Sequence, residues 1–211
     1  LEKQNRIKEE MIHNISHDLK TPITLIQTYS QSVKDDIYPY GSKEASMDVI
    51  IDNADRLERK VQSLLHLNRL DYLCESNSQE TVAMGELINE IAIQFRFMHP
   101  NIEFELSIED ATFVGDIEAW RIAIENILAN GCRYVKNRFV ITLTQDTLTI
   151  YNDGEHFDEA IVTSMFNPYE KGNKGQFGLG LSIVKKTCDI YGYSLSAKNE
   201  ELGVSFIISK K

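Results

Sequence analysis

The chain contains a histidine followed directly by an aspartate, His17-Asp18, in an amphipathic stretch near its first residue. The apolar residues around this pair recur at alternating steps of three and four, as in a helix that packs in a coiled coil or a four-helix bundle. This seam consists of Ile12, Ile15, Leu19, Pro22, Ile26, Tyr29 and Val33. His17 falls on the side of the helix farthest from the seam, so the spacing predicts an imidazole exposed to solvent.

An exposed imidazole beside a carboxylate can act as a nucleophile. The neutral ring carries a lone pair at physiological pH, and Asp18 can accept the proton of the other ring nitrogen and serve as a base. Thr21 follows His17 by four residues and therefore lies one turn along the same helix face. The alternative interpretation is a surface histidine that happens to precede an aspartate.

A second polar group has residue types that suit a metal–triphosphate. Asn126, Asn130, Arg133 and Tyr134 recur at helical spacing, and we expect them to share one face of a helix over residues 117–135. Amide oxygens can bind Mg²⁺, which prefers hard oxygen ligands, and arginine binds phosphate. The alternative is an ordinary solvated polar face.

Glycines follow in two places where a ligand would need to approach the backbone. Asn152-Asp153-Gly154 comes directly after a predicted strand, and Gly172, Gly175, Gly178 and Gly180 lead into a predicted helix. Such a loop exposes backbone amides, and the start of the helix favours anions. It is neither a P-loop, because the Gly-Lys-Ser/Thr ending is missing, nor a Rossmann fingerprint, because no βαβ unit surrounds it.

The phosphate-binding and nucleophilic candidates belong to different parts of the chain. Helices are predicted over residues 1–36, with a bend at Pro22, and over 43–72, and they are joined by a turn at 38–41. The second helix carries its own apolar stripe, which consists of Ile50, Ala54, Leu57, Val61 and Leu64. A hairpin this small has little core, so we expect it to dimerise into a four-helix bundle; docking on the second domain is the alternative.

The remainder of the chain mixes helices and strands. The polar residues 76–80 are predicted to be a linker between a hairpin domain, 1–75, and a second domain, 81–211. In the second domain we expect helices over 84–99, 117–135 and 181–191, and strands over 101–108, 112–114, 138–144, 147–151, 194–198 and 204–209. The predicted fold class is α+β: a dimeric helical hairpin followed by a two-layer α/β sandwich.

Composition limits the possible functions. The chain of 211 residues has a formal net charge of −10, which argues against direct binding of nucleic acid. Cys74, Cys132 and Cys188 match no metal spacing and are expected to be free thiols in a reducing compartment. No stretch is apolar enough to span a membrane, yet the chain begins at Leu1 inside a helical pattern, as a fragment of a longer protein would.

The segments Ser16-His17-Asp18-Leu19-Lys20-Thr21-Pro22, Asn126–Tyr134, Asn152–His156 and Gly175–Leu181 together resemble a known family. The first is similar to the phosphoacceptor box of sensor histidine kinases. The others, in order, resemble the Asn box, first Gly box and second Gly box of their ATP-binding domain, which has the Bergerat fold. The resemblance covers nearly all of the chain from Met11 to Lys211.

The resemblance implies a role for each matching residue. His17 would accept the γ-phosphoryl group of ATP, Asp18 would be the base, and Thr21 would position water for dephosphorylating a partner. Asn130 would bind Mg²⁺, and the loop from about residue 166 to 177 would be an ATP lid. The other implied nucleotide-binding residues are Asn126 and Arg133 at the phosphates, Tyr134 near the adenine, and Asn152, Asp153, Gly154, Lys171, Gly175, Gly178, Leu179, Gly180 and Leu181.

One box departs from the family pattern. The family usually has Asp-x-Gly-x-Gly, whose Asp accepts a hydrogen bond from the adenine amino group, whereas this chain has Asn152-Asp153-Gly154-Glu155-His156. Asn152 offers a neutral acceptor, which weakens the bond by roughly 1 kcal/mol. Asp153 is the alternative acceptor if the register is shifted by one residue.

The resemblance also implies partners and a location. We expect a homodimer that passes the phosphoryl group to the receiver domain of a response regulator and also dephosphorylates it. The chain would be the cytoplasmic portion of a plasma (inner) membrane sensor whose upstream sensor region is missing. The main alternative is a degenerate kinase that serves as a scaffold without ATP turnover; a gyrase-like or chaperone-like ATPase would lack the phosphoacceptor helix.

Overall fold

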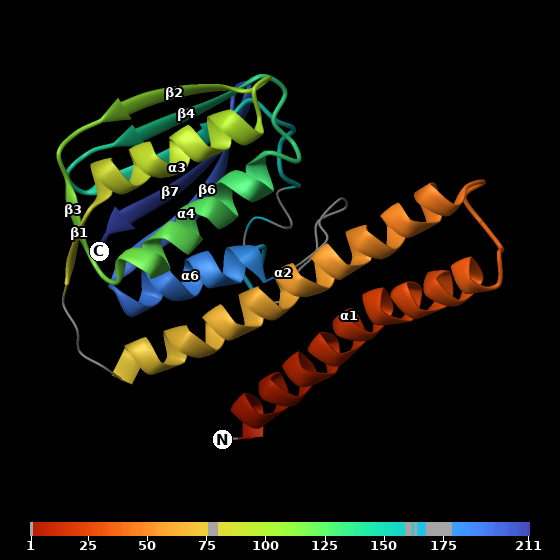
Figure 1. The fold of residues 1–211 in the computed structure, drawn as a ribbon. Coiled ribbons are helices and arrows are strands. Elements are labelled where there is room, and N and C mark those ends of the chain that lie inside the picture. The colour runs from red at the N-terminus through yellow and green to blue at the C-terminus, as the bar shows by residue number, and fades with distance from the viewer. Residues whose placement is uncertain (1, 76–79, 159–161, 163, 168–178) are drawn as a thin grey trace. The chain divides into compact units, whose positions relative to one another are not determined.

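The computed structural model describes residues 2–75, 80–158, 162, 164–167 and 179–211, and the chain divides into two compact units, Leu1–His66 and Leu67–Lys211 (Figure 1). The predicted linker residues 76–79 and most of the predicted lid lie outside the described residues.

The first unit is an antiparallel pair of helices (Figure 1). Helix α1 spans Glu2–Lys34, and helix α2 begins at Lys43 and continues to Glu75. Between them the chain turns at Gly41, whose φ of 85° is in the left-handed region that favours glycine. Ser42 Oγ accepts a hydrogen bond from Ala45 N at 3.0 Å and caps α2. The predicted helical hairpin is confirmed.

Helix α1 is continuous through Pro22, as the single helix predicted over residues 1–36 requires. A proline inside a helix leaves the carbonyl four residues earlier without its N–H donor. Here that carbonyl belongs to Asp18, and it accepts a hydrogen bond from Nζ of Lys60 on α2 instead. The lost backbone bond is therefore replaced, and the helix continues.

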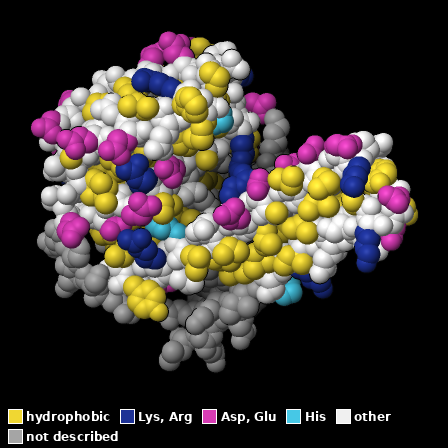
Figure 2. Space-filling view, in the orientation of Figure 1, with side chains coloured by type: hydrophobic (Ala, Val, Ile, Leu, Met, Phe, Trp, Pro, Cys, Tyr) yellow, Lys and Arg dark blue, Asp and Glu magenta, His cyan; other side chains and the backbone are white. Residues whose placement is uncertain are grey.

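The predicted apolar stripe of α2 divides between two faces. Ile50, Leu57 and Leu64 are half-buried in the hairpin, whereas Val61 is 41% exposed. An exposed apolar row on α2 has helical steps of three, four and seven and consists of Met47, Ile51, Ala54, Val61 and Leu65. Hydrophobic side chains are visible along the hairpin surface in Figure 2.

The second unit is built on a five-stranded sheet in the order β2-β4-β5-β7-β6. Its strands are β2 (Glu103–Ile108), β4 (Arg138–Leu143), β5 (Thr147–Asn152), β6 (Tyr193–Glu200) and β7 (Gly203–Lys210), and only the β2–β4 pair among them is parallel. Helices α3 (Met84–Met98), α4 (Ile117–Gly131) and α6 (Gly180–Ile190) cover one face (Figure 1). The predicted two-layer α/β sandwich is confirmed.

The core lies between this sheet and its helices because each element turns an apolar face inward. In β4, buried Phe139, Ile141 and Leu143 alternate with more exposed residues, which is the period of a strand with one buried face. Ile124 and Ile127 of α4 pack against the same core. An aromatic cluster closes one end, where Trp120 meets Tyr193 edge-on with ring centroids 5.0 Å apart.

Two features of the second unit differ from the sequence-based expectation. Helix α4 ends at Gly131 rather than near residue 135, because the next N–H groups, of Arg133 and Tyr134, donate to carbonyls three residues earlier instead of four. Thr81–Ala83 forms a short strand, β1, that pairs with β3 (Thr112–Val114) and was not predicted. The predicted division at residue 75 coincides with the end of α2, whereas the two compact units divide within that helix.

The two cysteines described with their side chains are free, as expected. Burial raises the pKa of the Cys188 thiol to about 12 and that of Cys132 to about 11. Because the thiolate is the reactive form, both side chains are inert packing residues at neutral pH.

Replacing Ile127 by alanine is expected to lower the free energy of unfolding of the second unit by about 2–5 kcal/mol, because a large-to-small change in a core leaves a cavity. Its side chain is 1% exposed, whereas Ile117 on the same helix is 54% exposed and provides the control Ile117→Ala. Urea unfolding followed by fluorescence of Trp120, the one tryptophan of the chain, measures both variants. Equal losses in the two variants would contradict this core assignment.

Candidate functional site

His17 projects from α1 with its side chain 77% exposed, as the helical periodicity predicted. Asp18 is much less exposed, at 19%, and its Oδ1 lies 3.9 Å from Nδ1 of His17. That separation is longer than a hydrogen bond, but a small side-chain rotation would close it. The pair therefore offers one ring nitrogen to the solvent and the other to a carboxylate.

Two further side chains support this pair. Thr21 Oγ1 donates to the backbone carbonyl of His17 at 3.2 Å, so the hydroxyl lies against the same turn as the imidazole. Lys60, which sequence reasoning did not select, lies 4.0 Å from Asp18 Oδ2 through its Nζ. Its position in α2 gives no signal in the sequence, because only the pairing of the two helices brings it to Asp18.

In the second unit, α4 closely approaches the start of α6. A Cβ atom added to Gly180 would lie 2.7 Å from Asn126 Oδ1, so only glycine fits without a shift. Asn126 Nδ2 donates to the Ile122 carbonyl at 2.8 Å, which fixes the amide and leaves its oxygen facing the start of α6. Two of the predicted site segments are thus neighbours in space.

The remaining residues of the predicted polar face come from two structural settings. Asn130 is half-buried in the last turn of α4, but Arg133 and Tyr134 belong to the turn after it. The expectation that all four residues share one helical face is therefore wrong. Because α4 ends early, Arg133 becomes an exposed side chain on a loop.

Asn152 lies at the end of β5 and beneath the end of α4. It is 2% exposed, and its Oδ1 accepts a hydrogen bond from Gly154 N at 3.1 Å. A Cβ atom on Gly131 would meet Asn152 Nδ2 at 3.3 Å, and one on Gly154 would meet the Tyr134 carbonyl oxygen at 2.7 Å. The glycines allow α4, its following turn and β5 to approach closely around the Asn152 amide.

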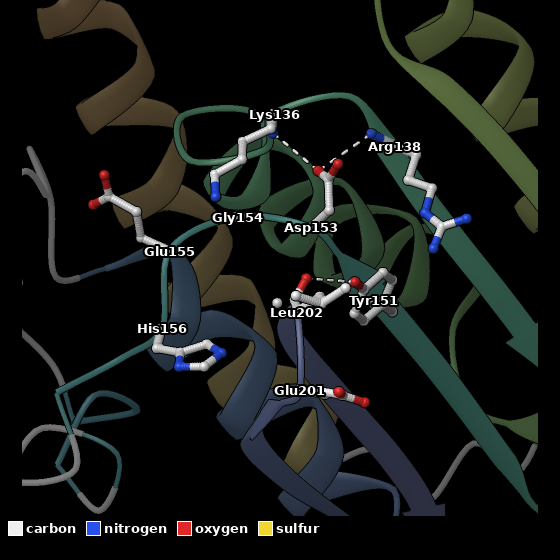
Figure 3. A pocket seen from close by; sticks show the side chains of 10 residues that line it. Lys136, Arg138, Tyr151, Asp153, Gly154, Glu155, His156, Glu201 and Leu202 are labelled. Carbon is white, nitrogen blue, oxygen red and sulfur yellow. Dashed lines mark hydrogen bonds between the residues drawn. The ribbon is translucent and has the colours of Figure 1, made fainter.

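The Asp153 carboxylate is used by the backbone of the loop before β4. It accepts N–H groups from Lys136 at 2.9 Å and Arg138 at 3.2 Å (Figure 3). It also accepts the N–H group of Asn137 at 3.0 Å. Burial raises the pKa of this carboxyl, but the backbone hydrogen bonds lower it by more, so the net pKa of Asp153 lies below its ordinary value.

Asp153 also faces a different side of β5 from Asn152. Consecutive residues at a strand point to opposite faces, and Asp153 lines an open groove of about 470 Å³ with Tyr151, His156 and Leu202 (Figure 3). Asn152 instead points to the helical layer, next to Gly131. The two candidate acceptors are therefore not interchangeable by a small shift.

The start of α6 suits an anionic ligand. Its N-cap residue, Leu179, makes no side-chain cap hydrogen bond, and Ser182 Oγ donates to the Leu179 carbonyl rather than accepting from a backbone N–H. Among the described residues no side chain caps the first N–H groups of the helix, and such groups, together with the helix dipole, favour a phosphate. The predicted residues Lys171, Gly175 and Gly178 lie outside the described residues, whereas Leu179, Gly180 and Leu181 begin this helix.

The segment that follows Gly154 is anchored by a residue that sequence reasoning missed. Asn199 on β6 accepts Phe157 N at its Oδ1, at 2.8 Å, and its Nδ2 donates to the Phe157 carbonyl at 3.0 Å. The Asn199 side-chain amide thus makes the two hydrogen bonds to the Phe157 backbone that a neighbouring strand would otherwise make. No local motif could reveal this, because the two residues are far apart in the sequence.

Comparison with known families agrees with both parts of this arrangement. Residues 7–73 match the His Kinase A (phospho-acceptor) domain, and residues 115–211 match the histidine kinase-, DNA gyrase B- and HSP90-like ATPase domain. The first contains the exposed His17-Asp18 pair, and the second contains the glycine contacts and the uncapped start of α6. The chain therefore belongs to the sensor histidine kinases, as the two-domain core of that family.

Individual relatives align with almost the whole chain. The sensor histidine kinase CssS of Bacillus subtilis (strain 168) is 37% identical over 215 residues, which cover 99% of this chain and 48% of the relative. The sensor protein SrrB of Staphylococcus aureus (strain MRSA252) is 28% identical over 223 residues, or 97% of this chain and 38% of that protein. The chain thus spans about half, or less, of the length of these curated relatives.

Solved structures give the same fold. The histidine kinase ThkA, in its complex with the response regulator protein TrrA, superposes with a TM-score of 0.74 at 22% identity, over 98% of this chain and 62% of that one. None of the helices in the described parts of the chain has the length and apolar character needed to cross a membrane.

Replacing Asp153 by asparagine is expected to lower the free energy of unfolding of the second unit at pH 7 by about 1–3 kcal/mol, the usual range for hydrogen bonds to a charged group. Because the folded-state pKa is depressed, this stabilisation is present above the ordinary value of 3.8 and is lost as the pH falls through the lower folded pKa. Urea titrations from pH 7 to below pH 4 measure the difference between the two proteins, which should shrink with acidification.

A suitable control for this measurement is Asp110→Asn, because Asp110 is exposed. It should change stability by less than about 0.5 kcal/mol. A difference between parent and Asp153→Asn that stays constant over the whole pH range would show that the carboxylate charge is not what holds the loop.

Proposed function

We propose that this chain transfers the γ-phosphoryl group of ATP to His17. The observation that carries the proposal is the exposed imidazole beside Asp18 on α1, in a chain that also has an ATPase-type domain with a glycine-lined, uncapped helix start. Because Asp18 lies at Nδ1, the free Nε2 is the nucleophile. The family to which the chain belongs supports the same assignment.

The proposed step is an in-line displacement at the γ-phosphorus. Nε2 of His17 forms the P–N bond while the bond to the leaving ADP oxygen breaks. The ring would become cationic as it attacks, and passing its Nδ1 proton to Asp18 leaves a neutral phosphoimidazole. Asp18 is thus a general base that acts on the nitrogen opposite the reacting one.

The nucleotide would be held by the second unit. Asn126 and the first N–H groups of α6 at Gly180 suit the phosphates, and the exposed Arg133 can add a cationic contact. Asn130 is the proposed ligand of Mg²⁺, which would offset charge on the phosphate oxygens. The residues present fit a metal–triphosphate, because an amide oxygen suits Mg²⁺ while helix N–H groups and a guanidinium suit phosphate.

Asn152 is the proposed acceptor for the adenine amino group. The Asp153 carboxylate already accepts three backbone N–H groups, whereas the Asn152 amide lies next to Gly131 and Gly154 near the end of α4. Its oxygen accepts from Gly154 N but has a second lone pair. Tyr134, in the turn after α4, would pack near the base.

Partners of the proposed kinase follow from the hairpin. ThkA was solved in complex with a response regulator, and a receiver domain is accordingly proposed as the phosphoryl acceptor here. Thr21 would orient water for dephosphorylation of that regulator.

A homodimer is supported by the apolar side chains that α2 exposes: Met47, Ile51, Val61 and Leu65 are 46%, 55%, 41% and 58% exposed. The chain would be the cytoplasmic portion of an inner-membrane sensor, since CssS and SrrB are longer sensor proteins.

His17→Gln is expected to abolish labelling by γ-labelled ATP and Mg²⁺, because the variant has no nucleophilic ring nitrogen. The label on the parent protein should be acid-labile and alkali-stable, as a phosphoramidate is. His13→Gln is the matched control, because His13 is an exposed histidine on the same helix, and it should label like the parent. Label that persists in His17→Gln would overturn the proposal.

Asn152→Leu is expected to weaken ATP binding by roughly 1–3 kcal/mol, because the adenine amino group would be buried without an acceptor. Asn152→Asp should bind ATP as tightly as the parent or more tightly, since an ionised acceptor makes a stronger hydrogen bond. GTP should bind poorly to all three proteins, because its six-position carbonyl does not donate. Calorimetry measures these affinities, and Trp120 fluorescence verifies that each variant is folded.

Asp153→Asn separates base recognition from support of the loop. If this variant, at unchanged Trp120 fluorescence, binds GTP as well as ATP while Asn152→Leu still prefers ATP, Asp153 reads the base; a loss of affinity for both nucleotides reflects the loosened loop. If the parent itself binds no ATP, the altered first Gly box favours the scaffold function instead, in which the dimer binds a regulator without turnover.

A further inference from the structure

Lys60 occupies an unusual position for a lysine. Its side chain is only 9% exposed, in the face of α2 that packs against α1 within the hairpin. Burying an ammonium group is costly unless it is paired and hydrogen-bonded. A buried lysine directly behind the proposed base therefore calls for a physical reason.

Pro22 explains why an ammonium group is stabilised at this buried position. Because proline has no N–H, the carbonyl of Asp18 lacks the donor that an uninterrupted helix would give it. Nζ of Lys60 donates to that carbonyl. The ammonium is thus tied to the backbone of the phosphoacceptor turn and not only to a mobile side chain.

This anchor places a positive charge beside the Asp18 carboxylate. Nζ lies 4.0 Å from Oδ2, while the other oxygen, Oδ1, lies 3.9 Å from His17 Nδ1. At 4.0 Å the contact is an ion pair rather than a hydrogen bond, so the carboxylate keeps its ability to accept a proton. One carboxylate oxygen, Oδ2, therefore lies near Lys60, and the other, Oδ1, lies near His17.

We propose that Lys60 is a positioning residue for phosphorylation of His17: fixed by the carbonyl that Pro22 leaves open, it attracts Oδ2 of the Asp18 carboxylate and so directs Oδ1 towards the imidazole. The inference rests on the proposed function. Lys60 acts through Asp18 and does not contact the reacting phosphorus.

The test is a double-mutant cycle with Asp18. Initial rates of His17 labelling at saturating ATP are measured for the parent, Lys60→Met, Asp18→Asn and the double variant. Lys60→Met should lower the rate by roughly 10-fold or more, up to the ~10²–10⁴-fold that a positioned base contributes. In the Asp18→Asn background the same change should have no further effect, because the carboxylate that Lys60 positions is already gone.

Further measurements separate this role from general stability. The affinity for ATP should be unchanged in Lys60→Met, because the proposed nucleotide residues belong to the second unit. Lys60→Gln keeps an N–H donor for the Asp18 carbonyl but removes the charge, so it should also label slowly. Lys60→Arg keeps the charge and should recover part of the rate. Lys43→Met, an exposed lysine on the same helix, is the matched control and should label like the parent.

The possible outcomes are distinct. Parent-like labelling of Lys60→Met or of Lys60→Gln would overturn the inference while leaving the kinase function intact. An equal fold-loss in the parent and Asp18→Asn backgrounds would also overturn it, because that pattern indicates a structural effect. If the parent itself shows no label on His17, the proposed function fails, and this inference fails with it.

Discussion

A single carboxylate organises the nucleotide end of the second unit. Asp153 collects the N–H groups of Lys136, Asn137 and Arg138, and so ties the end of β5 to the loop that enters β4. That loop follows the turn that contains Arg133 and Tyr134, so the same contacts attach the segment after α4 to the sheet. Without them the loop would lose its attachment to the sheet, and the residues proposed to surround the nucleotide would lose their common frame.

Absence of side chains is as important here as their presence. Gly131, Gly154 and Gly180 each stand where a Cβ atom would come within 3.0 Å of a neighbouring atom. They let α4, β5 and α6 approach until the amides of Asn126 and Asn152 lie between them. The residues that position the site are therefore held by packing from several elements. The backbone N–H groups among the proposed phosphate contacts, at the start of α6, need no side-chain rearrangement to bind an anion.

Sequence analysis predicted the features that depend on neighbouring residues and missed those that depend on contacts between residues far apart in the chain. Periodicity located both helices of the hairpin and almost every strand, because one face of each element is apolar and the spacing records it. The exposure of His17 followed from the same pattern. The end of α4 was missed because Cys132, Arg133 and Tyr134 favour no particular stop. Lys60 and Asn199 were missed because their partners, Asp18 and Phe157, are adjacent only in the folded chain.

The proline in α1 has a consequence for how this hairpin can vary among relatives. A chain with any other residue at position 22 would supply its own backbone N–H to the Asp18 carbonyl, and a buried ammonium at position 60 would lose its anchor. Conversely, an apolar residue at position 60 would leave that carbonyl bare whenever proline is present. Positions 22 and 60 lie on different helices, yet we expect them to co-vary among relatives, because proline at one position and lysine at the other compensate for each other.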